Sequence, residues 1–311
     1  MITNFITIKE NPPYLKLIIF LMILVISLIF TTLIGALFAI PFYGFDIINN
    51  LSELDISNPE NISVLKYFQI VNQLGLFIFP CLIFAFLVNQ NVSEYLKINK
   101  RPMFLSLIIA GLIMLAAIPV VNWLSNINGI ISLPKSLEGI ENLLKNYEKS
   151  AEKMTEVFLN VHTLSGLTLN IVMIGIIPAV GEEFLFRGVL LRLFNDWTKN
   201  CHIAILITAF LFSAMHLQFF GFIPRMLIGI LFGYLFVWTR SLWIPIFAHF
   251  INNTFAVIIT FLTNKGIINT DLDVVGTRSN DYIYLIISII VVSFLIIKIF
   301  LAEKKKLRSA F

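Results

Sequence analysis

The chain has 311 residues, of which 58% are hydrophobic and only 13% are charged, and its mean hydropathy is +0.91. A soluble domain carries about 45–50% apolar and about 25% charged residues, so a soluble core of this size cannot hide so much apolar surface. The net charge of +4 is small, and we expect no nucleic-acid partner. The composition therefore excludes a soluble protein and indicates an all-α, polytopic membrane helix bundle surrounded by lipid.

Apolar runs of about 20 residues, the length that crosses the hydrocarbon core, recur along the chain. We predict about eight transmembrane helices, near residues 17–42, 67–88, 103–123, 167–193, 203–222, 226–239, 242–262 and 282–301. The first run is too long for a signal peptide and lacks a small-residue cleavage pattern, so we expect it to be the first transmembrane helix. The sixth is short, and we expect Arg225 and Arg240 at its two ends to extend towards the headgroups as anchors. Contact of Arg225 with a substrate carboxylate is the alternative, and we favour the anchor.

Charged residues alternate between the connecting segments. Basic residues follow the second, fourth, sixth and eighth spans: Lys97, Lys100, Arg101, Arg192, Lys199, Arg240, Lys304, Lys305, Lys306 and Arg308. Acidic residues follow the first and seventh: Asp46, Glu53, Asp55, Glu60, Asp271, Asp273 and Asp281. Because basic loops lie in the cytoplasm, we predict that both termini are cytoplasmic. We expect the protein in a bacterial plasma membrane.

We predict one integral membrane domain with three parts. Residues 1–165 hold three transmembrane helices and an external loop, residues 166–262 hold the core helices with the polar motifs, and residues 263–311 hold the last helix and a basic tail. Within the loop, Lys135–Glu156 has apolar residues at helical spacing, which indicates an amphipathic surface helix. It either covers the entrance to the bundle or is an inert connector, and we favour the connector.

The fourth span carries charged residues, which are rare inside transmembrane helices and indicate function. Glu183 and Arg187 are four residues apart on one face of the helix, so we expect them to pair. Glu182 points about 100° away from Glu183, so its partners must be water or other helices. A purely structural network of the three remains the alternative, and it suits Glu183 and Arg187 better than Glu182.

Two further spans carry polar pairs at helical spacing. Phe212 and His216 share a face of the fifth span, and His249 and Asn253 share a face of the seventh. A lone histidine in an apolar helix is more often a packing residue. Two histidines, an aligned amide and an unpaired Glu182 on a third helix instead indicate one functional site.

These residue types together favour hydrolysis. A carboxylate in a dry site is a competent base, so Glu182 can take a proton from water while His216 orients that water or shares the proton. His249 and Asn253 can donate hydrogen bonds to the oxyanion that forms as water attacks a carbonyl group. The sequence contains no H-E-x-x-H zinc motif, no G-x-S-x-G nucleophile motif and no intramembrane aspartate pair.

At these positions the sequence resembles the CAAX-processing type II endopeptidase family, also called the CPBP or Abi family of intramembrane glutamate proteases. The family pattern is E-E-x-x-x-R, then F-x-x-x-H, then H-x-x-x-N or H-x-x-x-D. The matching residues are Glu182, Glu183 and Arg187, then Phe212 and His216, then His249 and Asn253. The resemblance extends over residues 172–255, under a third of the chain.

The resemblance implies an eight-helix bundle with a catalytic cavity open to the cytoplasmic side. It also implies that Glu182 and His216 activate water and that His249 and Asn253 bind the oxyanion. The two remaining charged residues of the first motif would support the site: Glu183 and Arg187. The implied substrate is a peptide or lipidated protein, processed at a CAAX-type C-terminus or at another membrane-associated peptide.

Three alternatives keep the same residues. Glu182, His216 and His249 could bind Zn²⁺ and leave a position open for water. The chain could also be a non-enzymatic immunity or scaffold protein, or a proton-coupled transporter. We favour a metal-independent peptidase without a cofactor. Gly229 and Gly233 form a G-x-x-x-G pair, which we expect to make an intramolecular helix contact rather than a homodimer.

Overall fold

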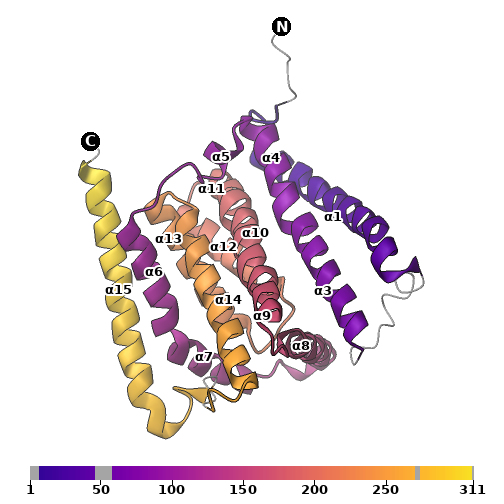
Figure 1. Cartoon of the computed structure of the whole chain (residues 1–311). Coiled ribbons are helices and arrows are strands. Elements are labelled where there is room, and N and C mark those ends of the chain that lie inside the picture. The colour runs from indigo at the N-terminus through magenta and orange to yellow at the C-terminus, as the bar shows by residue number, and fades with distance from the viewer. Residues whose placement is uncertain (1–6, 46–57, 270–273, 310–311) are drawn as a thin grey trace.

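The computed structural model describes residues 7–45, 58–269 and 274–309, and every regular element in these ranges is helical (Figure 1). The predicted all-α bundle is therefore confirmed. Five acidic residues of the predicted loops lie outside the described ranges: Asp46, Glu53, Asp55, Asp271 and Asp273.

The first half of the chain forms three long helical stretches. The first is α1 (Pro13–Tyr43), and the second joins α3 (Pro59–Gln73), η2 (Leu74–Ile78) and α4 (Phe79–Asn89). After the short α5 (Val92–Tyr95), the third stretch consists of α6 (Phe104–Ala116) and α7 (Ile118–Ile130), which are bent by 44° at their junction. The short η3 (Lys135–Leu137) then leads into α8 (Glu138–Leu159).

The second half holds the polar motifs. One continuous stretch consists of α9 (Leu164–Asn170), η4 (Ile171–Ile176), α10 (Ile177–Glu183), η5 (Phe184–Leu190) and α11 (Leu191–Thr198). It is followed by α12 (Cys201–Ala214), α13 (Phe222–Thr239) and α14 (Trp243–Asn264). The short η7 (Ser279–Asp281) precedes α15 (Tyr282–Ser309).

Six of the described helical stretches are long and apolar enough to cross a membrane, and the bent α6–α7 pair could supply a seventh. The predicted fifth span, 203–222, differs from this picture because α12 ends at Ala214 and has only 14 residues. The chain turns after His216, where Leu217 has a φ of 52°. An α-helix requires negative φ values, so α12 cannot continue through Leu217 to the predicted end of the span. Eight spans therefore remain a prediction.

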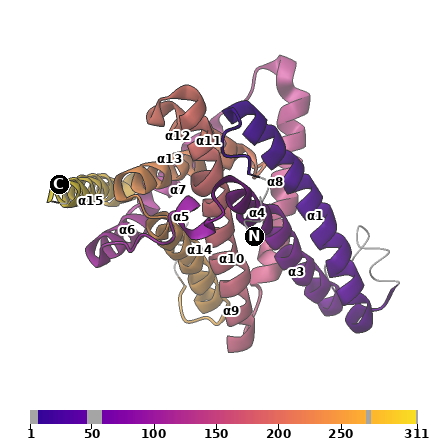
Figure 2. The same ribbon diagram turned by 90° about the horizontal axis from the view of Figure 1, so that it is seen from above.

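The start of α1 and the end of α15 lie at the same end of the bundle, together with α5, whereas α7 and α8 lie at the opposite end (Figure 1). Viewed from above, α10 and α14 lie near the middle of the molecule, while α1 and α15 are on opposite sides (Figure 2). The shared end agrees with the alternation of basic and acidic segments. The cytoplasmic position of this end stays a prediction.

The glycine pair of α13 packs against α12. A methyl group at Gly229 would lie 3.2 Å from the Cα of Ala209, and one at Gly233 would lie 2.9 Å from the Ile205 side chain. The absence of side chains at both positions therefore permits the close approach of these two helices. The expected intramolecular contact is present.

The carboxyl end of α8 is attached to three other helices. The Lys66 ammonium of α3 donates to the Phe158 carbonyl at 2.8 Å and to the Asn170 side chain at 3.0 Å. Asn170 also donates to the Phe158 carbonyl, at 2.8 Å, and Asn264 donates to the Leu159 carbonyl, at 3.0 Å. These bonds satisfy carbonyls that have no partner inside the last turn of a helix.

Lys66→Met should destabilise the protein by about 1.5–3 kcal/mol, because it removes a buried, charge-assisted pair of hydrogen bonds. Thermal unfolding in detergent measures this loss. Lys149→Met is the matched control, because Lys149 is exposed on α8, and it should change stability by less than about 0.5 kcal/mol. Equal effects of the two substitutions would contradict a structural role for Lys66.

Candidate active site

The four residues predicted to be catalytic line a single cavity of about 260 Å³. Glu182 comes from α10, His216 from the segment after α12, and His249 and Asn253 from α14. Three stretches that are distant in the sequence thus meet at one place. The other lining residues are Val121, Ser125, Phe212, Gly221, Pro224, Arg225, Ile228, Phe232 and Asn252.

The lining also indicates towards which end of the bundle the cavity extends. Val121 and Ser125 belong to α7, and Gly221 immediately precedes α13. Figure 1 places α7 at the end away from the start of α1 and the end of α15. The family resemblance implied a cavity open on the cytoplasmic side, where the termini are predicted to lie. The observed lining instead extends the cavity towards the opposite end.

Glu182 is 5% exposed, and it lines the cavity beside His249. Its Oε2 lies 3.9 Å from His249 Nε2, too far for a hydrogen bond. Within the part of the chain that the structure describes, this buried oxygen has no hydrogen-bond partner. Because buried carboxylate oxygens are normally satisfied, Glu182 is available to a polar group inside the cavity.

Glu183 joins two side chains. Its Oε1 accepts from Arg187 Nη1 at 2.7 Å and from His249 Nδ1 at 3.0 Å, so the predicted Glu183–Arg187 pair is present. Arg187 is 1% exposed and also donates to the Gly229 carbonyl of α13 at 2.8 Å. Its guanidinium carbon lies 4.9 Å from the centre of the Phe212 ring. The pair thus ties α14 and α13 to the helix that carries Glu182.

The hydrogen bonds of the two histidines determine which ring nitrogen of each is a donor. A carboxylate or a carbonyl oxygen can only accept, so His249 Nδ1 donates to Glu183 and His216 Nδ1 donates to the Phe212 carbonyl, at 2.9 Å. The Nε2 atom of each neutral ring is then an acceptor. His249 Nε2 becomes a donor only when the ring is protonated.

Phe212 separates the two histidines. Its ring centre lies 5.4 Å from that of His216 and 6.0 Å from that of His249, in edge-to-face geometry both times. Sequence reasoning placed Phe212 on the face of His216 but gave it no role. Its carbonyl orients one histidine and its ring packs against both.

The amide of Asn253 is partly committed to the fold. Its Nδ2 donates to the Ile174 carbonyl at 3.0 Å, and its Oδ1 accepts from Asn252 at 3.1 Å. A primary amide has two N–H groups, so Asn253 keeps one for another acceptor. Sequence reasoning missed Asn252, which also lines the cavity, because an Asn-Asn pair shows no helical spacing.

The turn after His216 is fixed by two other helices. The buried Glu148 carboxylate of α8 accepts from the Phe220 backbone N–H at 2.9 Å and from that of Gly221 at 3.3 Å. Asn128 of α7 donates to the Phe219 carbonyl. The interpretation of α8 as an inert connector is therefore wrong, because α8 holds the segment that bears His216 and borders the cavity.

The structure does not assemble the alternative zinc site. Across residues 7–45, 58–269 and 274–309, no three His, Cys, Asp or Glu side chains gather closely enough to hold a metal ion. Glu182, His216 and His249 line the same cavity without forming such a group.

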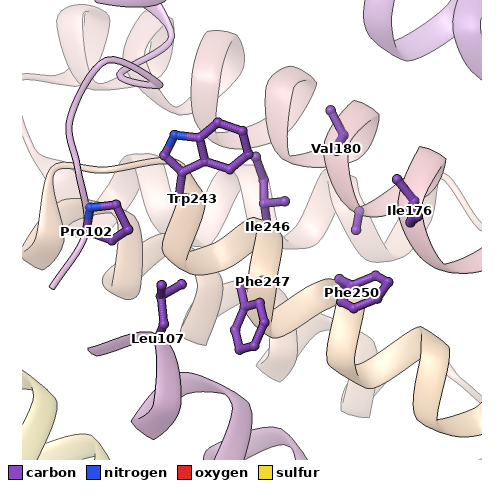
Figure 3. Close-up of a pocket in the computed structure, with 9 residues that line it drawn as sticks. Pro102, Leu107, Ile176, Val180, Trp243, Ile246, Phe247 and Phe250 are labelled. Atoms are coloured by element: carbon purple, nitrogen blue, oxygen red, sulfur yellow. The ribbon is translucent and has the colours of Figure 1, made fainter. Parts of the chain in front are cut away.

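An apolar groove lies on another face of α14 (Figure 3). Its volume is about 510 Å³, and Trp243, Ile246, Phe247 and Phe250 of α14 line it together with Pro102, Leu107, Ile176, Ala179 and Val180. Residues His249, Asn252 and Asn253 face the polar cavity instead. The helix therefore separates an apolar groove from a polar cavity.

Comparison with known proteins finds similarity in the region that contains all three motifs. Residues 164–255, which span all three motifs, match the family described as type II CAAX prenyl endopeptidase Rce1-like. Through this region, which is under a third of the chain, the sequence is similar to that family. No solved structure matches the chain significantly.

Three relatives align with about a third of the chain or less. YdiL of Bacillus subtilis (strain 168), named as a proposed membrane peptidase, is 31% identical over 104 residues, which are 33% of this chain and 41% of YdiL. The membrane-embedded CAAX protease MroQ of Staphylococcus aureus (strain USA300) is 33% identical over 100 residues, 30% of this chain and 40% of MroQ. The uncharacterized YpbD of Bacillus subtilis is 33% identical over 86 residues, 26% of this chain and 41% of YpbD. The chain thus spans about two fifths of each of these relatives.

The two adjacent glutamates should differ sharply in their effect on stability. Glu183→Gln leaves Arg187 buried without its ion-pair partner and should cost about 3–5 kcal/mol. Glu182→Gln removes a charge whose Oε2 makes no hydrogen bond, so it should leave stability unchanged or slightly raised. Thermal unfolding of both variants in the same detergent compares them. Equal losses would show that the Glu183 network is not the stabilising one.

Proposed function

We propose that this protein is an intramembrane endopeptidase that hydrolyses a peptide bond with water activated by Glu182. One observation carries the proposal: a buried carboxylate oxygen of Glu182, without a hydrogen-bond partner among the described residues, shares a cavity with two histidines from other parts of the chain. The family match supports the peptidase class.

In the proposed reaction, the Glu182 carboxylate takes a proton from a water molecule whose oxygen attacks the scissile carbonyl carbon. His216 Nε2 accepts the other water hydrogen and so orients the attack. The protonated Glu182 then passes its proton to the leaving amine as the C–N bond breaks. Positioned acid–base groups of this kind typically contribute about 10²–10⁴-fold to the rate.

The oxyanion requires donors that are already in place. Asn253 has one uncommitted N–H, and His249 Nε2 donates in the protonated state of the ring. Glu183 orients His249 from the opposite side of the ring, and Arg187 holds Glu183. The base is Glu182, whereas the Glu183–Arg187 pair orients the oxyanion donor His249.

The proposed substrate is a peptide or a lipidated protein that reaches the site from the membrane. CAAX-type processing is supported by the family description and by the name of MroQ. We propose a bacterial plasma membrane as the location, since the aligned relatives come from Bacillus subtilis and Staphylococcus aureus. The reaction as proposed uses no metal.

Cleavage of a quenched fluorescent prenylated CAAX peptide by the detergent-purified protein tests the proposal. Glu182→Gln and His216→Ala should each lower kcat by at least about 100-fold, because each removes a group that handles the attacking water. His202→Ala, a histidine outside the cavity that bonds Tyr234 instead, is the control and should retain activity. Full activity of Glu182→Gln would favour the scaffold interpretation, and loss of wild-type activity with a chelator would favour zinc.

Glu148→Gln should lower kcat/KM by about 10-fold or more, because small displacements of a catalytic group reduce rates strongly. In this variant, the backbone N–H groups of Phe220 and Gly221 lose their ionised acceptor, and we expect His216 to move with the turn. Glu152→Gln, on the exposed face of the same helix, is the matched control. An unchanged rate for Glu148→Gln would mean that α8 does not position the site.

A further inference from the structure

Arg225 lies in the first turn of α13 and lines the same cavity as Glu182. The sequence suggested an anchor that extends towards the headgroups, and the structure contradicts this. Its Nη2 donates to the Gln218 side chain, and its Nη1 is buried without a hydrogen-bond partner among the described residues. The guanidinium is therefore turned into the protein.

This charge makes no close ion pair among the described residues, although the Glu182 and Glu148 carboxylates attract it from a longer distance. The ion pairs in the described parts of the chain join Lys145 with Glu141, Arg187 with Glu183, and His249 with both intramembrane glutamates, and none includes Arg225. A guanidinium stays charged at any pH that proteins tolerate, and an unpaired charge inside a membrane bundle is expensive. An anion that binds in the cavity would compensate this cost.

The guanidinium packs directly against the turn before α13. A methyl group at Gly221 would lie 2.8 Å from Arg225 Nη2 and 3.1 Å from Nη1, so the missing side chain lets the guanidinium occupy this place. Gly221 is itself held by Glu148, at 3.3 Å. The amino end of the 18-residue α13, where the helix dipole is positive, lies beside it. These features favour a preorganised site for an anion.

We propose that Arg225 binds the free C-terminal carboxylate of the peptide substrate. This rests on the proposed peptidase function and names the residue that recognises the carboxyl terminus of the substrate. A planar guanidinium with free N–H groups matches a carboxylate by two parallel hydrogen bonds. Among the parts of a peptide, only acidic side chains and the C-terminus carry such a group, and the C-terminus is present in every sequence.

The first test compares each enzyme variant with two peptides that differ only in a C-terminal carboxylate or amide. Wild type should cleave the free acid at least 10-fold faster in kcat/KM, and Arg225→Gln should abolish this ratio. Arg225→Lys, which keeps the charge but not the planar fork, should give an intermediate ratio. Arg240→Gln, at the exposed far end of α13, should leave the ratio unchanged. The ratio is taken within one variant, so partial misfolding does not affect it.

A second test separates this proposal from the peptidase function. Fluorescent forms of both peptides are titrated into Glu182→Gln protein in detergent, where binding is read without cleavage. The free acid should bind at least 10-fold more tightly than the amide, and Arg225→Gln in the same background should remove the difference. Binding preference without wild-type cleavage would retain the carboxylate site and reject the peptidase.

Two results would overturn the proposal. Equal binding of acid and amide would show that Arg225 does not recognise the terminus. Loss of the preference in millimolar inorganic phosphate, together with thermal stabilisation by phosphate that Arg225→Gln lacks, would identify a phosphate group as the natural anion.

Discussion

The carboxylate of Glu183 is the interaction on which the candidate site depends. One oxygen accepts from both Arg187 and His249, and Arg187 continues to the backbone of α13 at Gly229. Three helical stretches are therefore joined through two buried charges. Because each charge would be costly alone, the network forms only when all three stretches are in place. It leaves Oε2 of the neighbouring Glu182 without a hydrogen-bond partner among the described residues, as the proposed role of Glu182 as a base requires.

Helix α14 has two environments on its two sides. Its polar side presents His249, Asn252 and Asn253 to the cavity, while Phe247 and Phe250 face the apolar groove of Figure 3. A membrane enzyme must keep water and charged groups away from lipid, and a helix packed between other helices provides that separation.

The end of the bundle that contains α7 and α8 holds the segment that bears His216. There α8 and α7 bind the turn between His216 and α13 through Glu148 and Asn128. Leu217 adopts a left-handed conformation within that turn. Strained residues persist where the surrounding structure holds them, and they are frequent at functional sites. The same turn brings Gly221 against Arg225, so one segment positions both a histidine and a guanidinium.

The sequence by itself determined the membrane class, the helical fold and the membership of the four motif residues in one site. Composition decides the first two, and fixed spacing along a helix reveals pairs such as Glu183 with Arg187. Tertiary structure decided the rest, because its contacts join residues with no regular spacing. Glu148 meets Phe220 across 72 positions of the chain, and Asn252 has no helical partner to reveal it. The inward turn of Arg225 likewise depends on Gln218 and Gly221, whose positions follow from the early end of α12. Local periodicity reports which face of a helix a residue occupies, whereas only the packed bundle decides what that face meets.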